Sequence, residues 1–514
     1  MTNTTENNKR IVKNTLLLYI RMLFTIIVGL YTSRIVLDIL GVSDYGIYNV
    51  VGGIITMLAF LNVAMTGASQ RFISFELGRQ NKERLKLVFS TSILIHFSLA
   101  GIVFIIAETI GLWFINTHLN IEPDRMVAAN YTYQCSILSF ILTIISVPYN
   151  SCIVAHEHMK AYAYVSILEV SLKLLIAYLL PILPADKLIC YAIMSLSVAV
   201  IIRIVYGIYC KRHFEECAFH FTYDRQLFKN MFSFAGWNTL GNLGFSIKDQ
   251  GANIILNIFF GTTINAARGI AIQVNSIINN FAQNFLMALN PQITKQYACN
   301  NIQQSVNFVY TGCKFSFYLL MIISIPFILN KEYLLGLWLK DVPQYTSLFL
   351  ELTLIIASVE VLSYPLTTAL QATGKIKSVQ IFVCLIMLCE LPAAYLILEC
   401  GGKPHMTMYP TLLASIIKLF VRFYLLKTYI PLYNMRFFCN AIILKCFLVG
   451  ISCFFISSFI KAQFDTNFIS LIINVTLSTA TNLLIIILLG LSSSEKEFLI
   501  EKIRLLIYHH KQPK

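Results

Sequence analysis

The sequence predicts an all-α integral membrane protein that crosses the bilayer about 14 times. Long apolar stretches recur along its 514 residues, 57% of which are hydrophobic and only 12% charged. A hydrocarbon core about 30 Å thick needs roughly 20 apolar residues for each helical crossing. Spans in lipid must satisfy their own backbone hydrogen bonds, so they are helices or closed barrels, and these Leu- and Ile-rich stretches are too long for barrel strands.

The expected membrane helices follow one another through short connections. Their apolar runs cover residues 14–38, 45–68, 87–115, 127–154, 162–183, 188–210, 231–260, 264–291, 306–329, 346–370, 378–399, 406–427, 439–460 and 467–491. The polar start, Met1 to Arg10, lacks a small-residue cleavage pattern, so we expect a cytoplasmic tail there and no signal peptide.

The distribution of Lys and Arg predicts the orientation of these helices. Alternate segments, starting with the N-terminal tail, hold 23 of these residues, whereas the intervening loops hold 6 and the helices themselves hold 10. Positive residues near helix ends resist translocation, so both termini are expected in the cytoplasm. Most of the net charge of +14 is then explained by the cytoplasmic loops that orient the helices in the membrane. No nucleic-acid partner is therefore expected.

Similar segments recur at a nearly constant spacing and predict an internal duplication. Segment 41–46, the expected first outer turn, matches 261–266, Pro148 matches Pro365, and Lys211 matches Lys427, all 216 to 220 residues apart. Six crossings return the chain to its starting side, so two pseudo-symmetric lobes should enclose a central cleft. The expected divisions are an N-lobe, a cytoplasmic linker, a C-lobe, two further helices and an amphipathic cytoplasmic tail, at residues 1–210, 211–230, 231–427, 428–491 and 492–514.

One predicted helix, 264–291, carries a polar stripe. At 100° per residue, five side chains fall within about 80° of arc. They are Arg268, Asn275, Asn279, Gln283 and Asn290. Amides and a guanidinium suit sugar hydroxyls and a phosphate, so Arg268, Asn275, Asn279 and Gln283 are candidate substrate ligands. The alternative is hydrogen bonding between helices, on the order of 1 kcal/mol per contact.

Two further cations are candidates for binding an anion within the membrane. Arg21 has no acid one helical turn away. Lys248 and Asp249 interrupt an apolar span between Gly244 and Gly251, which predicts a bent or broken helix. A charge in lipid costs roughly 3 kcal/mol or more, so these two side chains should face water, each other or a ligand.

Among the acids, Glu360 and Asp249 are candidates for coupling transport to a proton or a sodium ion. Glu360 lies five residues before a proline and has no cation within one turn. A desolvated carboxylate takes up a proton more readily, which allows loading and release during a transport cycle. Glu390 lies nearer a helix end and should touch headgroups or water, while Lys418 and Arg422 should snorkel toward the inner surface.

Other motifs give little support for enzymatic chemistry. None of the 13 cysteines forms a CxxC pair, so they are interpreted as small apolar fillers. The triplet 156–158 is not a HExxH motif because Lys160 stands where histidine is needed, and the P-loop-like segment 373–375 has Ala369 where glycine is needed. We therefore expect no enzyme, no metal site and no cofactor.

The chain resembles a known protein family over nearly its whole length. Three runs of sequence carry this resemblance. They are 34–46, Gln70-Arg71-Phe72, and 253–273 with its Phe-Phe-Gly and Asn-Ala-Ala-Arg-Gly runs. The chain resembles the Wzx-type flippases of lipid-linked polysaccharide repeat units, in the superfamily that also holds drug and cation extruders and lipid II flippases. The resemblance implies alternating-access transfer of an undecaprenyl-pyrophosphate-linked oligosaccharide to the outer leaflet of a bacterial inner membrane. It also implies a cationic cleft containing Arg21, Lys248 and Arg268.

The residues themselves favour the same substrate class, because guanidinium and ammonium groups bind a pyrophosphate through charge-assisted bonds. Expected partners are the lipid-linked oligosaccharide, membrane lipids, a proton or sodium ion, and other polysaccharide-assembly proteins. Two alternatives remain open. A drug or cation antiporter of the same fold should have a net acidic cleft, and a membrane glycosyltransferase or polymerase should have a long outer segment.

Overall fold

The computed structural model describes residues 2–56, 59–118, 121–217, 224–260, 262–339, 342–464, 467–493 and 495–497. Within these ranges every regular element is a helix and no strand occurs, which confirms the all-α prediction. Most of the predicted amphipathic tail, from residue 498 onward, lies outside the described residues.

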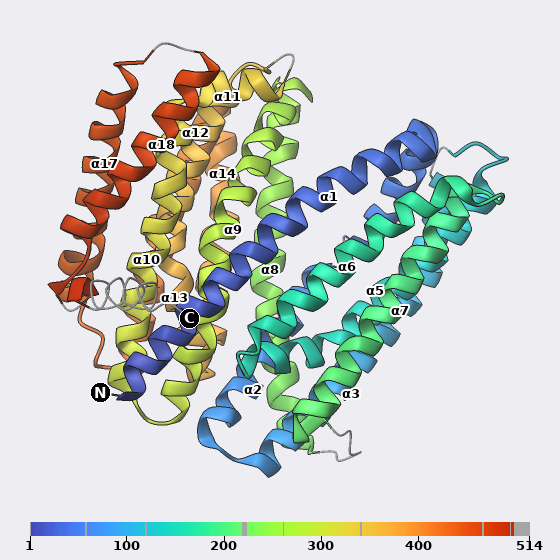
Figure 1. Cartoon of the computed structure of the whole chain (residues 1–514), viewed down its shortest axis with the longest axis horizontal. Helices are drawn as coiled ribbons and strands as arrows, with labels where there is room; N and C mark the ends of the chain where they lie inside the picture. The colour runs from blue at the N-terminus through green and yellow to red at the C-terminus, as the bar shows by residue number, and fades with distance from the viewer. Residues whose placement is uncertain are drawn as a thin grey trace, which may run out of the picture. The chain divides into compact units, whose positions relative to one another are not determined.

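The helices follow in order along the chain (Figure 1). The first half contains α1 (Thr2–Thr56), α2 (Ala59–Arg79), α3 (Lys82–Ile106), η1 (Ala107–Gly111), α4 (Leu112–His118), α5 (Met126–Ala155), α6 (Met159–Leu179), η2 (Leu180–Ile182), α7 (Lys187–His213), η3 (Glu215–Cys217) and α8 (Arg225–Phe260). The second half contains α9 (Thr262–Ala298), α10 (Ile302–Leu329), α11 (Lys331–Trp338), α12 (Thr346–Glu360), η4 (Val361–Ser363), α13 (Tyr364–Thr373), α14 (Lys377–Glu399), η5 (Pro404–Thr407), α15 (Met408–Tyr429), α16 (Met435–Phe437), η6 (Phe438–Leu444), α17 (Lys445–Lys461), α18 (Phe468–Ile485) and η7 (Ile486–Gly490).

Eleven helical stretches in the described part of the chain are long and apolar enough to cross a membrane. They correspond to all the predicted spans except 45–68, 231–260 and 264–291. The last two are helical, as α8 and α9, but polar residues such as Lys248 and Arg268 lower their apolar character. A multi-pass membrane protein is therefore confirmed, whereas the count of 14 is not.

The long helix α1 consists of two helices that meet at Gly41. This residue has φ 75° and ψ 171°, which is not helical. A positive φ is open to glycine without steric cost, because glycine has no Cβ. The break falls at the first residue of the outer turn predicted from the sequence, so one glycine ends the first membrane helix.

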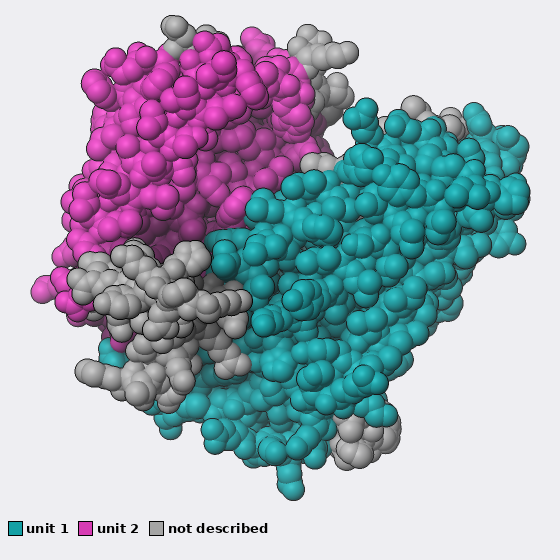
Figure 2. Space-filling model, in the orientation of Figure 1, with its two compact units in different colours: residues 1–246, 287–305, 368–385 teal, residues 247–286, 306–367, 386–514 magenta. Residues whose placement is uncertain are grey.

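The described chain divides into two compact units (Figure 2). Unit 1 comprises residues 1–246, 287–305 and 368–385, and unit 2 comprises 247–286, 306–367 and 386–514. Unit 1 thus combines the first seven α-helices with segments of later ones. The predicted lobes, separated by the linker 211–230, remain a proposal.

In unit 1, α5 packs along α7, α2 and α3, while α1 packs along α6 (Figure 1). Apolar side chains such as Phe89 and Ile153 fill the core between these helices. A buried acid adds a polar connection, because the Glu157 carboxylate accepts hydrogen bonds from Lys295 at 2.6 Å and from Gln292 at 2.8 Å. The turn after α5 is thereby joined to the C-terminal part of α9.

In unit 2, α12 packs along α15, and α17 packs along α18 (Figure 1). Large apolar side chains remain exposed on the last two helices, including Phe455, Phe459 and Ile469. A water-soluble protein would bury most such groups, whereas a bilayer solvates them. These faces therefore suit contact with lipid.

A charged cluster in unit 1 ties together the starts of two helices. Arg125, just before α5, binds the Asp44 carboxylate through two nitrogens at 2.9 and 2.5 Å and reaches Asp186 at 2.5 Å. Asp186 also caps α7 by accepting bonds from the backbone N–H groups of Leu188 and Ile189. Burial opposes ionisation, but the hydrogen bonds from Arg125 and Ile189 hold the pKa of the Asp186 carboxyl below its usual range.

We predict that Gly78→Ala destabilises the protein by about 1 to 3 kcal/mol because it overpacks the contact between α2 and α9. An added Cβ would lie 2.7 Å from the backbone oxygen of Lys295 and 2.8 Å from Cβ of Ala298. Gly101→Ala is the matched control, since Gly101 is helical and has no neighbour within 4 Å. Thermal unfolding in detergent should show the loss for Gly78→Ala only; equal stability of the two variants contradicts this packing.

We predict that Asp186→Asn lowers the unfolding temperature at neutral pH. The difference in unfolding temperature between the variant and the wild type should become smaller at acidic pH. The folded pKa lies below the unfolded one, so the stabilisation is present above about pH 4 and is lost as pH falls through the folded value. Asparagine also caps helices well, so the variant isolates the charge. Unfolding temperatures measured between about pH 7 and about pH 3 test this.

Asp224→Asn is the control for that series. Asp224 accepts bonds from the backbone N–H groups of Gln226 and Leu227 but has no ion pair with a basic side chain in the described residues. Its substitution should change stability little at any pH. If the unfolding temperatures of Asp186→Asn and the wild type differed by the same amount at every pH, that result would contradict the role of the ionised carboxylate.

Candidate functional site

Two lysines and two glutamates form an alternating ionic chain inside unit 2. Lys248 Nζ on α8 lies 3.8 Å from Glu390 Oε2 on α14. Lys418 Nζ on α15 lies 3.6 Å from Glu390 Oε1 and 3.1 Å from Glu360 Oε1 at the end of α12. Ser415 Oγ donates a further hydrogen bond to Glu360 at 3.0 Å. Four helices thus contribute to one network.

The centre of this network is deeply buried, whereas the Glu360 side chain is 27% exposed. Lys418 is 1% exposed and Glu390 is 4% exposed. Taking such ions out of water costs several kcal/mol each, and only good pairing compensates for that cost. The two cations beside Glu390 lie beyond hydrogen-bonding distance, so this carboxylate is paired by charge without tight bonds. A network paired in this way can exchange partners when another anion enters.

The position of Glu360 follows from the local sequence. The helix α12 ends at Glu360, a 3-10 turn follows, and α13 begins at Tyr364 with Pro365 next. Proline is well tolerated in the first turn of a helix, where its missing N–H is not needed. The carboxylate therefore lies at a junction between two helical segments, beside α15.

Tyr364 connects the ionic chain to the polar stripe of α9. Asn279 Nδ2 donates to the Tyr364 hydroxyl at 3.1 Å, and Gln283 bonds to the same hydroxyl. Glu360 lies within electrostatic range of both Tyr364 and Arg422. Two of the three predicted amide ligands thus belong to the same network as the coupling candidate Glu360.

Some polar atoms around the network have no partner in the described part of the protein. The amide oxygens of Asn275 and Asn279 and the Nε group of Arg422 are buried and make no hydrogen bond there. Buried polar groups are normally satisfied, so each unsatisfied one requires an explanation. A polar ligand that enters this region would find both donors and acceptors.

Arg268 is engaged by neighbouring side chains of α8. Its guanidinium donates to Asp249 Oδ1 at 2.6 Å and to the Asn253 amide oxygen. Asp249, the second coupling candidate, is therefore the counterion of Arg268. The sequence indicated that Lys248 and Asp249 should face water, each other or a ligand, but each pairs with another side chain: Asp249 with Arg268 and Lys248 with Glu390.

The helix is not broken around Lys248 and Asp249, so that part of the prediction of a bent or broken helix is wrong. Residues 225–260 form one helix, α8. Its glycines instead allow close packing, because a Cβ on Gly251 would lie 2.6 Å from Leu391 and one on Gly244 would lie 2.8 Å from Cys384.

The sequence also misplaced two charges of this site. Glu390 was expected at headgroups or water, and Lys418 and Arg422 were expected to snorkel, yet Glu390 and Lys418 are buried and paired with each other. Local spacing along one helix cannot detect such pairs, because their partners come from other helices. The one indication of such ion pairs in the sequence is that several apolar helices carry charges of opposite sign.

Two predicted polar residues lie in unit 1. Arg21 on α1 donates to Ser166 Oγ at 3.5 Å and lies over the ring of Tyr162 with 4.7 Å to its centroid. Asn290, at the end of the polar stripe, accepts a hydrogen bond from Thr368 at 3.0 Å. For Asn290 the alternative of hydrogen bonding between helices is therefore confirmed.

The network has the composition of an anion-binding site. Four cations, Lys248, Arg268, Lys418 and Arg422, face three carboxylates, which leaves one excess positive charge. An incoming phosphate could replace a carboxylate as counterion, and the displaced carboxylate could then take up a proton. The metal-ligating group found in the described residues lies elsewhere, around Cys152 in unit 1.

Comparison with known proteins gives the family and the fold. A family model described as "Polysaccharide biosynthesis protein" matches residues 11–297. No curated protein matches the chain. Solved structures with the same fold include a MATE in the bent conformation, with TM-score 0.72, 13% identity and coverage of 82% of this chain and 95% of that one.

Two further solved structures are similar. One is an outward-facing multidrug resistance MATE family transporter of the MOP superfamily, with TM-score 0.70, 13% identity and coverage of 83% and 97% of the two chains. The other is a MOP superfamily transporter from Pyrococcus furiosus, with TM-score 0.69, 13% identity and coverage of 82% and 95%, whose description states a reverse polarity of its binding pocket. At these identities the likeness shows the fold alone, which is that of MOP superfamily transporters.

We predict that Lys418→Met lowers the free energy of unfolding by about 3 to 5 kcal/mol, because it leaves buried carboxylates without their shared cation. Combining it with Glu390→Gln should restore part of this loss. Lys331→Met is the control, since Lys331 pairs with the more exposed Glu351, and its loss should cost about 1 kcal/mol or less. Unfolding in detergent measures all three; an effect of Lys418→Met no larger than the control contradicts the shared pairing.

Proposed function

Because the chain belongs to the polysaccharide biosynthesis protein family and is a membrane transporter by fold, we propose that it is a flippase for a lipid-linked oligosaccharide. The substrate is an undecaprenyl-pyrophosphate-linked repeat unit of an O-antigen, capsule or exopolysaccharide. The protein moves it from the inner to the outer leaflet of a bacterial inner membrane by alternating access, with both of its own termini in the cytoplasm. Other polysaccharide-assembly proteins are its proposed partners.

One observation carries this proposal, namely the excess of buried cations in unit 2. A pyrophosphate brings at least two negative charges, and ammonium and guanidinium groups bind it strongly where water is scarce. Lys248 and Arg268 are the proposed ligands in this unit, and Arg21 remains a proposed ligand in unit 1. Lys418 and Arg422 join this set, since they share the same carboxylates.

The sugar part of the substrate requires neutral polar partners. The amide oxygens of Asn275 and Asn279 accept no hydrogen bond from the described residues, so they suit sugar hydroxyls. Gln283 and Tyr364 extend this surface toward Glu360. The polyprenyl tail needs no polar site, because it can stay in the surrounding lipid.

The acids of the network provide a route for ion coupling. When the pyrophosphate takes over Lys418, Glu360 and Glu390 lose a counterion and should bind a proton or a sodium ion. Release of substrate on the outer side would restore the ion pairs and release that ion. Asp249 and Arg268 form a second pair that can open in the same manner.

The alternative is a drug or cation antiporter, which the fold likeness to MATE transporters also favours. A site for organic cations should be net acidic, whereas the network of unit 2 carries more cations than carboxylates. A glycosyltransferase or polymerase is the third candidate. Of the three candidates it has the least support, because the similar solved structures are transporters.

We predict that Lys248→Gln and Arg268→Gln each reduce flipping of a defined lipid-linked oligosaccharide in reconstituted vesicles by roughly 10- to 100-fold. Each loses a charge-assisted bond of about 1.5 to 3 kcal/mol. Lys331→Gln, outside the network, should transport at the wild-type rate. Appearance of the sugar on the outer leaflet is measured with an impermeant enzyme or lectin.

Comparing vesicles with and without a pH or sodium gradient completes this test. The gradient that drives the wild type should have no effect on Glu360→Gln, which cannot exchange an ion. Full activity of both cation variants would contradict the proposed ligands. Transport of organic cations, with no transfer of the glycolipid by the wild type, would favour the antiporter.

A further inference from the structure

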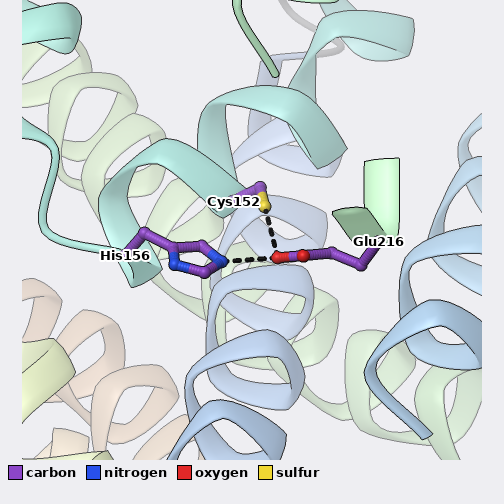
Figure 3. Close-up of side chains that lie close together, drawn as sticks. All are labelled: Cys152, His156 and Glu216. Atoms are coloured by element: carbon purple, nitrogen blue, oxygen red, sulfur yellow. Dashed lines mark hydrogen bonds and ion pairs between the residues drawn. The ribbon is translucent and has the colours of Figure 1, made fainter. Parts of the chain in front are cut away.

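Three metal-ligating side chains of unit 1 converge between the end of α5 and η3 (Figure 3). Cys152 and His156 lie one helical turn apart at the C-terminal end of α5, and Glu216 comes from η3, 60 residues after His156. The Sγ, Nε2 and carboxylate oxygen atoms all lie within 4.8 Å of one another. Figure 3 shows the thiol and the imidazole both pointing at the carboxylate.

The spacing of these atoms is close to that of a tetrahedral zinc site. With bond lengths of about 2.3 Å to sulfur and about 2.1 Å to nitrogen or oxygen, ligand atoms are about 3.6 Å apart for S and O and about 3.4 Å apart for N and O. Cys152 Sγ lies 3.4 Å from Glu216 Oε1, close to that value. His156 Nε2 lies 2.5 Å from the same oxygen, as a hydrogen bond does. To reach the N–O spacing of a zinc site, the imidazole has to move away from this oxygen by about 0.9 Å.

A second thiol lies beside Cys152, although it is not among the three ligand atoms that all lie within 4.8 Å of one another. Cys217 Sγ is 3.6 Å from Cys152 Sγ, near the roughly 3.8 Å between two thiolates on one zinc ion. Both thiols are buried, as is Glu216, while the His156 side chain is 23% exposed. The imidazole is thus the most exposed of these side chains.

The neighbouring residues hold the imidazole in a defined orientation. Phe214 stacks on the His156 ring with 4.2 Å between centroids and 17° between planes. Such supporting contacts orient the ligands of metal sites and affect affinity strongly. The stacked ring can slide within its own plane without losing this contact, which permits the small movement that coordination requires.

We propose that Cys152, His156 and Glu216 form a binding site for zinc or a similar borderline divalent metal ion, with Cys217 as a fourth ligand that has to turn toward the ion. Thiolate with imidazole selects such ions, whereas magnesium and calcium prefer oxygen alone. The bound ion would join the end of α5 to the segment that follows α7, as a structural clip in unit 1. The sequence predicted no metal site because its ligands come in two pairs about 60 residues apart, with no familiar spacing.

Cobalt(II) is the probe for this site, because thiolate coordination gives it a charge-transfer absorption and tetrahedral coordination gives it intense visible bands. The full-length, tag-free protein in detergent is stripped with a chelator and titrated with cobalt. We expect these bands to saturate at one ion per chain and to disappear when zinc is added. Zinc should also raise the unfolding temperature of the stripped protein, since it binds the folded state only.

Variants decide whether the ion is bound by these four residues. Cys152→Ser and His156→Gln should each weaken cobalt binding at least roughly tenfold and remove the stabilisation by zinc. Cys453→Ser is the matched control, since it removes another fully buried thiol that lies in unit 2. Because His156 is partly exposed, its variant should fold even if Cys152→Ser does not.

Two results would overturn the proposal. One is a stripped wild-type protein that shows no thiolate band with cobalt, in which case His156 and Glu216 form a simple ion pair. The other is a band of unchanged intensity and affinity in His156→Gln. Neither result depends on transport, so the outcome is separate from that of the flippase assay.

Discussion

Buried charge that must find its counterion within the protein is the constraint on which unit 2 depends. Lys418 is almost fully buried, and it touches carboxylates from two different helices. Neither lipid nor an apolar core can solvate these groups, so α12, α14 and α15 must keep the spacing that pairs them. The packing of the helices and the pairing of the charges therefore support each other, and a change in one should alter the other.

The two units use buried charge differently. Glu157 of unit 1 is held by hydrogen bonds of 2.6 and 2.8 Å, which saturate its carboxylate and fix a turn. Glu390 of unit 2 has cations at 3.6 and 3.8 Å, and Asn275 of the same unit has a buried oxygen with no partner in the described residues. Satisfied networks make a structure rigid, while incompletely satisfied ones retain the capacity to bind. The contrast favours a structural role for the first and transport for the second.

The helices also differ in how apolar they are, and this difference agrees with a division between structural and transport roles. α17 and α18 expose large apolar side chains and lie in stretches that are long and apolar enough to cross a membrane. α8 and α9 are longer helices, but their polar residues keep them out of the clearly apolar set. Helices that are too polar for lipid must line protein or water, which is where a transporter handles its substrate.

The sequence by itself determined the all-α membrane architecture and the turn at Gly41, and it drew attention to the polar residues Arg268, Asn279, Gln283 and Glu360. These features depend on composition and periodicity within one helix, which a short window of sequence contains. Only the tertiary structure decided that Glu360 and Glu390 share Lys418, that α8 is unbroken, and that Cys152 meets Glu216. Such contacts join residues far apart in the chain, and their formation depends on how helices pack, which local periodicity does not encode.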